Sequence, residues 1–401
     1  MNPSDIVLCA PVRTPIGKFG GVLSPLSAAD LGTAAAVACL ERSGIAGDQI
    51  DQSIFGHGRQ AGGGPNTARQ IAFRAGVPVD RPAFTVNQAC GSGLQAVLSA
   101  ARTILLGEAE VILVGGTESM SNTPYLLPRA RTGYRMGHAE IVDGMYRDGF
   151  DDPLSKMVMG ETAEELAAER GISREASDLY ALESQLRCER ARKAGRFTPE
   201  IAPITVPGRK GDVLVETDEH PRDGATLESL AKLQPVFRKG GAVTAGNASG
   251  ITDGAAALLV ASRAAAERLG LKIEARLVAW TVVGVEPRIM GIGPVPAVEK
   301  LLGKTGVALA DVEAIELNEA FACQVLACVE GLGLDPARVN PDGGAIALGH
   351  PIGATGARIL VTLLHGMAAR GETRGIATLC ISGGMGIAAM VEREANGESR
   401  I

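Results

Sequence analysis

The sequence predicts an α/β fold made of two similar halves, with a charged lobe inserted into the first half. Three observations lead to this prediction. Strand-like apolar runs alternate with helix-like patterns in both halves of the chain. The signals of the second half repeat those of the first half. The stretch over residues 120–246 has a different character, rich in charged residues, proline and glycine.

The composition is that of a globular protein with a large core. Of 401 residues, 46% are hydrophobic and 21% are charged, which suits two or three domains. The net charge of −6 does not suggest a nucleic-acid or membrane-surface protein. No run approaches 18 uninterrupted apolar residues, and the N-terminus enters a strand almost directly. We therefore expect no membrane span, no signal peptide and a cytoplasmic location.

The cysteines and histidines do not form a metal or disulfide pattern. The seven cysteines are scattered, odd in number and without a C-x-x-C pair, and the five histidines are dispersed. This pattern favours a reducing compartment and predicts neither a disulfide framework nor a metal site. The patterns G-x-G-x-x-G after a strand, G-x-x-x-x-G-K-S/T and H-E-x-x-H are also missing, which disfavours nicotinamide, nucleoside-triphosphate and zinc chemistry.

The first half is predicted to alternate strands and helices. Strands are expected at residues 6–10, 50–56 and 111–114, and another is expected to end at residue 86. Gly115-Gly116 closes the strand at residues 111–114. Helices are expected at residues 28–42, 67–75 and 94–105, the last from apolar positions spaced i, i+3, i+4 and i+7. Such alternation indicates substantially parallel sheets. Within the lobe, one helical stretch is expected over residues 161–193.

The second half repeats this order. Val86-Asn87 recurs as Val339-Asn340, and the apolar stripe that begins at Leu94 recurs 263 positions later, at Ala357. Between the matched features the second copy carries ten extra residues, which include His350. Two similar halves packed face to face would bring equivalent turns together near their join.

We therefore divide the chain into three parts. The N-terminal half is residues 1–119 plus 247–271, the inserted lobe is residues 120–246, and the C-terminal half is residues 272–401.

Cys90 lies in the turn between a predicted strand and a predicted helix. Backbone N–H groups at a helix N-terminus lack intrahelical partners and favour an anion. The pKa of a thiol placed there can fall to between about 3.5 and 7.5, and the thiolate is a nucleophile. The alternative is that Cys90 is a small buried apolar residue, as free cysteines commonly are.

Three further segments hold candidate catalytic or binding residues. His350 stands among glycines ahead of a predicted helix, where its imidazole can move a proton near neutral pH. Cys380 ends a buried strand and reads as core when taken alone, but beside Cys90 and His350 it becomes a candidate acid or base. Asn318 either caps a helix or holds a water or carbonyl oxygen with its amide. Residues 245–254 form either a loop or a ligand cradle.

Four motifs in this order resemble the thiolase family, and the acetyl-CoA acetyltransferases most closely within it. They are Val-Asn-Gln-Ala-Cys90-Gly-Ser-Gly-Leu, Asn318-Glu-Ala-Phe, Gly-His350-Pro-Ile-Gly-Ala-Thr-Gly-Ala-Arg and Cys380-Ile-Ser-Gly-Gly-Met-Gly. The likeness runs essentially end to end. It implies a five-layered α-β-α-β-α core of duplicated halves, with an inserted loop domain that binds coenzyme A.

The resemblance also implies an acyl-CoA C-acyltransferase that condenses or cleaves short-chain 3-oxoacyl-CoA through a thioester on Cys90. The expected reaction joins two acetyl-CoA into acetoacetyl-CoA and CoA. His350 would help to form the Cys90 thiolate, and Cys380 would move the proton to and from carbon. His350 and a water held by Asn318 would form one oxyanion hole, and the backbone N–H groups of Cys90 and Ser382 the other.

CoA would be a substrate rather than a cofactor, and the resemblance assigns it a set of binding positions. Arg222 and Ser229 would lie around the nucleotide, and Ser249 near the pantetheine. The remaining implied positions are Ala245, Met159, Met290, Phe237 and Phe321. Three cations either add positive charge for phosphates or lie on a solvated face, namely Arg209, Lys210 and Arg238. The family further suggests an oligomer of identical chains, a dimer or a tetramer.

Two positions depart from the family pattern. Ser382 stands where glycine is usual, so its side chain could crowd the oxyanion site. Val158 stands where short-chain biosynthetic members often carry histidine, which keeps open a degradative 3-oxoacyl-CoA thiolase of broader or longer chain specificity. The Asn318 motif and Cys380 argue against a decarboxylating ketosynthase. A non-catalytic CoA-binding scaffold is the alternative of another class, and the intact motifs disfavour it.

Overall fold

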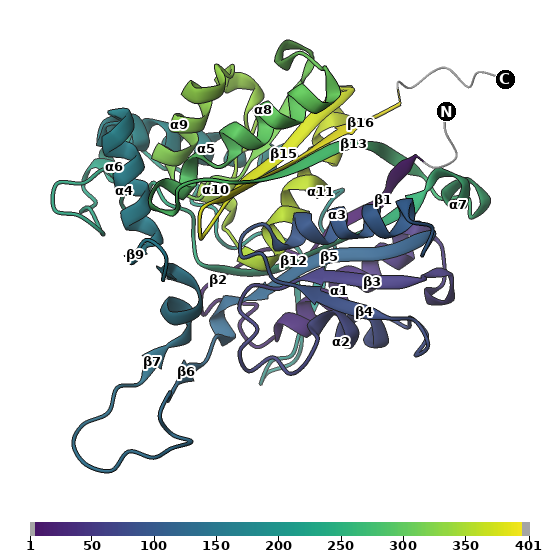
Figure 1. Ribbon diagram of the computed structural model, residues 1–401, viewed down its shortest axis with the longest axis horizontal. Coiled ribbons are helices and arrows are strands. Elements are labelled where there is room, and N and C mark those ends of the chain that lie inside the picture. Colours follow the sequence, from purple (N-terminus) through teal and green to yellow (C-terminus); the bar gives the residue numbers. More distant parts are fainter. Residues whose placement is uncertain (1–4, 395–401) are drawn as a thin grey trace.

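The computed structural model describes residues 5–394. Within them one ten-stranded sheet runs in the order β14-β15-β16-β13-β1-β12-β5-β3-β4, with β2 paired to β12 (Figure 1). The strands are β1 (Ile6–Arg13), β2 (Gly17–Lys18), β3 (Gln52–Gly56), β4 (Ala83–Val86), β5 (Val111–Ser119), β12 (Thr252–Ser262), β13 (Ile273–Gly284), β14 (Ala314–Leu317), β15 (Arg374–Ile381) and β16 (Met385–Glu392).

The sheet consists of two similar halves that join where β1 pairs with β13. Each of these strands is followed by a helix and another strand, α1 (Ala28–Ser43) and β3 in the first half, and α8 (Pro294–Thr305) and β14 in the second. From the join outward the order is β12, β5, β3 on one side and β16, β15, β14 on the other. The counterpart of β4 is a single bridge between Ile315 and Val339. The predicted duplication is confirmed.

The predicted parallel pairing is correct only toward the edges of the sheet. β3 is parallel to β4 and β5, and β14 is parallel to β15, whereas the central strands β1, β12, β13 and β16 pair in antiparallel fashion. β16 follows β15 through a tight turn at Gly383 and Gly384, whose φ angles of 84° and 82° suit glycine. Alternation of strands and helices reveals parallel crossovers only, so it does not predict the antiparallel pairing of a strand that follows a hairpin or an insertion.

The prediction that the strand beginning at residue 111 ends at Gly115-Gly116 is wrong, because β5 continues to Ser119. These glycines lie inside the strand because a helix approaches it closely. A Cβ at Gly116 would overlap the carbonyl oxygen of Gly353, at the start of α11 (Ile352–Arg370).

Helices and half-sheets form the five layers implied by the resemblance. α1 and α2 (Thr67–Arg74) cover the outer face of the first half-sheet, and α8 and α9 (Ala322–Leu332) that of the second (Figure 1). α3 (Ser92–Leu105) and α11 pack between the two half-sheets. Strand residues alternate between layers, since Val7 and Cys9 join the outer cluster beneath α1 while Ile6 and Leu8 join the central one.

By length and composition one helix, α11, could cross a membrane. Its apolar stretch is 83% buried inside the protein, so α11 is the core helix of the middle layer. Glycines bring α3 and α11 together, since a Cβ at Gly93 would lie 2.6 Å from the backbone nitrogen of Ala357.

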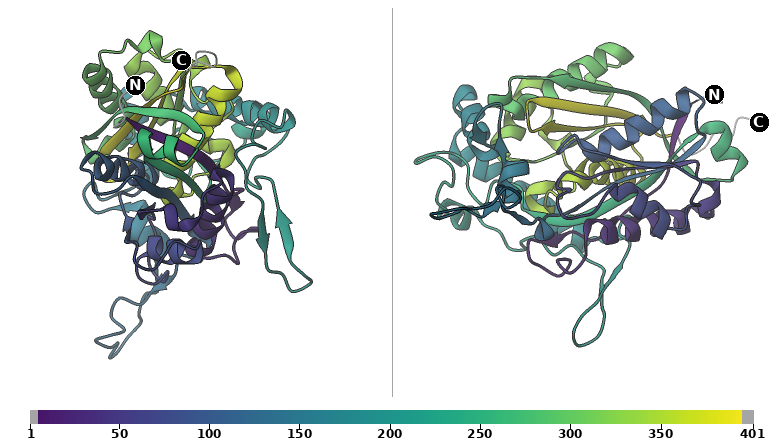
Figure 2. Two further views of the ribbon diagram at one scale, coloured as in Figure 1. Left: turned by 90° about the vertical axis from the view of Figure 1, so that its right-hand side faces the viewer. Right: turned by 60° about the horizontal axis from the view of Figure 1, so that its bottom comes forward.

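The lobe between β5 and β12 contains two long helices rather than the one helical stretch predicted. α4 (Met159–Arg170) ends at Gly171, which has φ 64°, and α5 (Arg174–Lys193) starts behind Ser173, whose side chain accepts the N–H of Ala176. The shorter elements are α6 (Leu227–Ala231), β6 (Tyr125–Leu126), β7 (Val142–Asp143), β8 (Asp151–Asp152), β9 (Met157–Val158), β10 (Ile204–Val206) and β11 (Val213–Val215). The arms at β6–β7 and β10–β11 project from the body (Figure 2).

Candidate active site

One cavity of about 540 Å³ takes its walls from both halves and from the lobe. Most of the predicted site residues line it: Cys90, Met159, Arg222, Phe237, Ala245, Ser249, Met290, Phe321, His350, Cys380 and Ser382. The segment that the sequence left as a loop or a cradle forms one wall, through Ala245 and residues 248–251.

Cys90 lies just before α3, as predicted, and is half-buried against the cavity. Its turn is tightly held. Ala89 has φ 44°, a left-handed conformation unfavourable for alanine, and Ser92 Oγ accepts the N–H of Gln88 at 2.8 Å. The N–H groups of Gly91 and Ser92 bond to carbonyl groups within the same turn. The turn therefore fixes the position of the Cys90 sulfur and occupies some of the N–H groups that would attract an anion.

The pKa of the Cys90 thiol is raised, contrary to the prediction for a helix N-terminus. Burial raises this pKa most. The charge of Arg59 and the backbone N–H groups of Ser382 and of Cys90 itself lower it only in part. Resting Cys90 is therefore a thiol, and a base must take its proton.

His350 lines the same cavity as Cys90 and has the tautomer that such a base requires. It is buried at the cavity wall, and its Nδ1 lies 2.6 Å from Thr355 Oγ1. The Thr355 hydroxyl donates its own proton to the carbonyl of Pro351 at 2.9 Å, so it accepts from His350. The ring proton is thus on Nδ1 and a lone pair is on Nε2.

The Nε2 atom of His350 has no hydrogen-bond partner within residues 5–394. Burial, together with the charges of Arg358 and Arg59, lowers the pKa of the imidazole to about 3. The ring is therefore neutral at ordinary pH and presents a free base toward the cavity.

Cys380 and Ser382 come from the second half. Cys380 is the next-to-last residue of β15 and is 2% exposed. Burial, and then the negative charge that Cys90 would carry, raise the pKa of Cys380 well above its usual value. Cys380 is therefore a protonated thiol beside Cys90, and the N–H of Ser382 is directed at the Cys90 sulfur.

The N-cap interpretation of Asn318 is wrong, because α9 begins at Ala322 with Phe321 at its N-cap. Asn318 directly follows β14 and is 1% exposed. Neither its Oδ1 nor its Nδ2 has a partner among the described residues. Each unsatisfied buried polar group costs about 1–3 kcal/mol, so this amide is suited to hold a molecule from outside the chain. It does not itself line the cavity.

Several implied CoA positions lie elsewhere. Ser229 is outside the cavity lining and closes the capping box of α6. Arg238 pairs with a glutamate of α4, and Arg209 and Lys210 are exposed in the turn between β10 and β11. Of these predicted cations, only Arg222 lines the cavity.

Glu118 of β5 positions the site, and the sequence analysis missed it. Its carboxylate accepts the N–H groups of Gly58 and Arg59, each at 3.1 Å, and that of Gly353 at 2.8 Å. It also lies 3.2 Å from His57 Nε2. Glu118 therefore ties the loop after β3 to the start of α11.

Glu319, part of a quoted motif without a role of its own, ties the lobe to the loop before His350. It accepts hydrogen bonds from Tyr180 and Ser184 of α5, at 2.9 and 2.7 Å. It also accepts bonds from Asn340 and from the N–H of Ile346, both at 3.0 Å. The sequence showed these carboxylates but not their burial, which is what reveals their role.

The charge of the cavity is one-sided. Lys18, Arg59 and Arg222 line it, and the described lining contains no Asp or Glu. Such a surface favours an anionic ligand. Sequence reasoning missed Lys18 and Arg59. The available signal was that Arg59 follows the end of a strand, where ligands bind in α/β folds.

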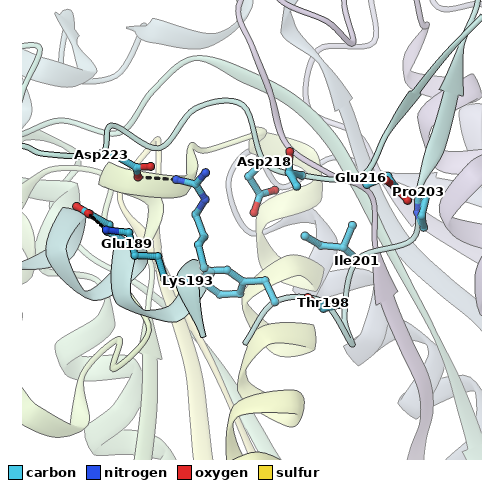
Figure 3. A pocket seen from close by; sticks show the side chains of 11 residues that line it. Glu189, Lys193, Thr198, Ile201, Pro203, Glu216, Asp218 and Asp223 are labelled. Atoms are coloured by element: carbon cyan, nitrogen blue, oxygen red, sulfur yellow. Dashed lines mark hydrogen bonds and ion pairs between the residues drawn. The ribbon is translucent and has the colours of Figure 1, made fainter. Parts of the chain in front are cut away.

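A second cavity of about 460 Å³ lies beside the end of α5 and residues 216–218 (Figure 3). It holds none of the predicted site residues. Arg192 there pairs with Asp223 at 2.7 Å, and Lys193 pairs with Glu189. Its cations are thus matched by carboxylates, unlike those of the first cavity.

Comparison with known proteins agrees with this geometry. A family model described as thiolase, N-terminal domain, matches residues 6–264, and one described as thiolase, C-terminal domain, matches residues 271–393. The chain is 52% identical to an acetyl-CoA acetyltransferase of Pseudomonas aeruginosa, over 97% of this chain and 100% of that protein. It is 50% identical to one of Cupriavidus necator, over 98% and 100%.

Solved structures are similar as well. The Bacillus anthracis acetyl-CoA acetyltransferase superposes with a TM-score of 0.96 at 44% identity, over 98% of this chain and 99% of that one. Human mitochondrial 3-ketoacyl-CoA thiolase in complex with CoA gives a TM-score of 0.94 at 42% identity, with the same coverage.

Proposed function

This chain belongs to the thiolase family, and we propose that it catalyses the reversible condensation of two acetyl-CoA to acetoacetyl-CoA and CoA. The observation that carries the proposal is a single cavity that holds one cysteine from each half and the free Nε2 of a neutral histidine. The two bacterial relatives, both named acetyl-CoA acetyltransferase, support the acetyl substrate.

In the cleavage direction, His350 Nε2 takes the proton of Cys90 as the sulfur attacks the 3-oxo carbon. The bond between C2 and C3 breaks, and Cys380 gives its proton to C2, so that acetyl-CoA leaves and an acyl group stays on Cys90. The Cys380 thiolate then takes the proton of incoming CoA, whose sulfur attacks the thioester. The departing Cys90 sulfur recovers its proton from His350.

Two sets of donors would stabilise the negative oxygens of these steps. The N–H groups of Cys90 and Ser382 serve the carbonyl at Cys90, where a donor of this kind is worth about 2.7–4 kcal/mol. Protonated His350 and a water held by Asn318 serve the thioester oxygen of the acetyl-CoA enolate. The raised pKa of Cys380 suits it to protonate carbon.

CoA would enter the cavity with its thiol end first, so that its nucleotide stays at the exposed end. Exposed Lys18 and Arg222 are suited to its phosphates, and Ala245 and Ser249 would follow the pantetheine. Met159 and Met290 would bound a short acyl group. A degradative thiolase of longer chain specificity is the second candidate, because Val158 leaves an apolar wall at this place.

We also propose that the chain forms a homo-oligomer, a dimer or a tetramer, and acts in cytoplasmic fatty acid metabolism. β4 is an uncovered edge strand at the end of the sheet. Phe84 on this strand and Leu105 and Leu106 at the end of α3 are exposed. An apolar edge of this kind favours pairing with a second copy.

Variants of the two cysteines test the reaction. We expect the unmodified enzyme to cleave acetoacetyl-CoA in the presence of CoA, and Cys90→Ser to abolish both cleavage and exchange of acetyl groups between CoA molecules. Cys380→Ser should block cleavage more than exchange. Cys188→Ser, a buried cysteine of α5 outside the cavity lining, is the control.

Full condensation activity in Cys380→Ser would contradict its role as acid and base. Absence of turnover in the unmodified enzyme would favour the scaffold alternative. Rates measured across 3-oxoacyl-CoA substrates of increasing length decide between the acetyl-specific and the degradative candidate.

A further inference from the structure

Arg59 is a buried cation in the catalytic cavity that the reaction above does not use. It is 6% exposed and lines the same cavity as Cys90 and His350. Its Nη1 donates a hydrogen bond to the carbonyl of Asp148 at 3.1 Å, and its Nε has no partner in the described part of the chain. Within residues 5–394 it forms no ion pair with a carboxylate. An unpaired buried charge is unfavourable, so this site is built for an anion from outside the chain.

The guanidinium is held in place by its surroundings. The backbone N–H of Arg59 bonds to Glu118, and its Cζ lies 5.8 Å from the ring centre of Phe150, a cation–π geometry. The chain passes directly over it, since a Cβ at Gly149 would overlap the guanidinium. The charge of Arg59 lowers the pKa of Glu118, but this carboxylate makes no direct ion pair with the guanidinium, since it accepts three N–H groups and contacts His57.

Arg59 lies near the reacting atoms rather than with the exposed cations. Its charge lowers the pKa values of both Cys90 and His350. Lys18 and Arg222, in contrast, have solvent-exposed side chains, which suits them to bind the phosphates of CoA. The lining residues Phe150 and Val158 are apolar, so Arg59 would be the anion-binding group for an acyl chain seated among them.

We propose that Arg59 binds a carboxylate at the far end of a longer acyl group, so that among 3-oxoacyl-CoA substrates longer than acetoacetyl-CoA the enzyme prefers those derived from dicarboxylic acids. The planar guanidinium can bind a carboxylate through two hydrogen bonds. This inference rests on the proposed function. The bonds formed and broken are those given above, and only the acyl group on Cys90 differs.

The test compares two substrates of equal chain length. One is 3-oxoadipyl-CoA, whose acyl chain ends in a carboxylate, and the other is 3-oxohexanoyl-CoA, whose chain ends in a methyl group. We expect the unmodified enzyme to cleave the first with a kcat/KM about tenfold higher or more, as charged hydrogen bonds allow. Arg59→Met should reduce this ratio to one or below, and Arg59→Lys should keep part of it. A variant that loses activity equally toward both substrates leaves this ratio of kcat/KM values unchanged.

A ratio of one or below in the unmodified enzyme overturns the proposal without any variant. An unchanged ratio in Arg59→Met also overturns it, because both substrates would then lose activity together and Arg59 would act on Cys90 or on folding. The proposed function is tested separately by acetoacetyl-CoA. If that substrate is cleaved and the ratio is one, only the carboxylate inference fails; if no substrate is cleaved, the proposed function fails.

Discussion

At the scale of single residues, the neighbours of the catalytic groups decide their protonation. Thr355 uses its only proton on the Pro351 carbonyl, and this sets the tautomer of His350. Burial then keeps that imidazole neutral and Cys90 a thiol. In the proposed reaction, the Cys90 nucleophile is thus formed by proton transfer within the site rather than held as a resting thiolate.

The pH dependence of Cys90 alkylation should show that its resting side chain is a thiol. Because burial raises the pKa of the thiol above its ordinary value of 9.0, the thiolate fraction at neutral pH is small. We expect the rate of inactivation by iodoacetamide to keep rising with pH past 9.0. The rate should be measured in Cys380→Ser, so that only one of the two cavity cysteines reacts, with the labelled residue identified by mass spectrometry. A plateau with a midpoint below pH 8 would be inconsistent with the structure.

At the scale of elements, His350 depends on how closely α11 packs on β5. The start of α11 follows His350 directly, and its first turn lies against the backbone of β5 at Gly116. A glycine is required there because any side chain would meet the carbonyl oxygen of Gly353.

Gly116→Ala should therefore move α11 away from β5 and His350 with it. We expect a loss of about 1–3 kcal/mol in the free energy of unfolding, as for other overpacked cores, and a lower kcat for acetoacetyl-CoA cleavage. Gly303→Ala is the matched control, because no atom lies within 4 Å of the added Cβ inside α8. That substitution should stabilise the helix by about 0.5–1 kcal/mol. The melting temperature and kcat should be measured for both variants. A Gly116→Ala enzyme with unchanged melting temperature and kcat would refute the packing argument.

The elements also show what sequence reasoning could reach. Local patterns predicted the turn at Cys90, the helix after it and the repeat that carries His350. They did not predict the antiparallel pairing of β12 and β16, because strand direction is set by pairing across the sheet. They also missed the roles of Glu118 and Arg59, since burial and distant partners decide these. The pKa of Cys90 was predicted in the wrong direction because the helix N-terminus is visible in the sequence and desolvation is not.

At the scale of the whole molecule, three of the five histidines have lowered pKa values: His220 and His350, which are buried, and His365, which is half-buried. Burial is the main cause for each. An unfolded chain binds protons at these residues below about pH 6.5, while the folded chain does not until a lower pH. Each therefore contributes stability that is present above pH 6.5 and is lost as the pH falls toward the folded value.

His365 isolates this effect away from the catalytic cavity. Its ring nitrogen lies 3.0 Å from the carbonyl of Pro11, and Glu200, Glu274 and Arg42 act on its charge. We expect His365→Gln to melt at a lower temperature than the unmodified protein at pH 7.5, and this difference to narrow as the pH falls to 5. Melting temperatures across this range test the prediction. A difference that widens on acidification would show that folding raises the pKa of His365.

The join at β1 and β13 has a consequence for how the enzyme is made. Cys90 belongs to the half that leaves the ribosome first, whereas Cys380 stands on β15, 290 residues later along the chain. A chain interrupted between these two positions thus carries the first cavity cysteine without the second. If both cysteines act as proposed, translation must pass β15 before this protein can turn over a substrate.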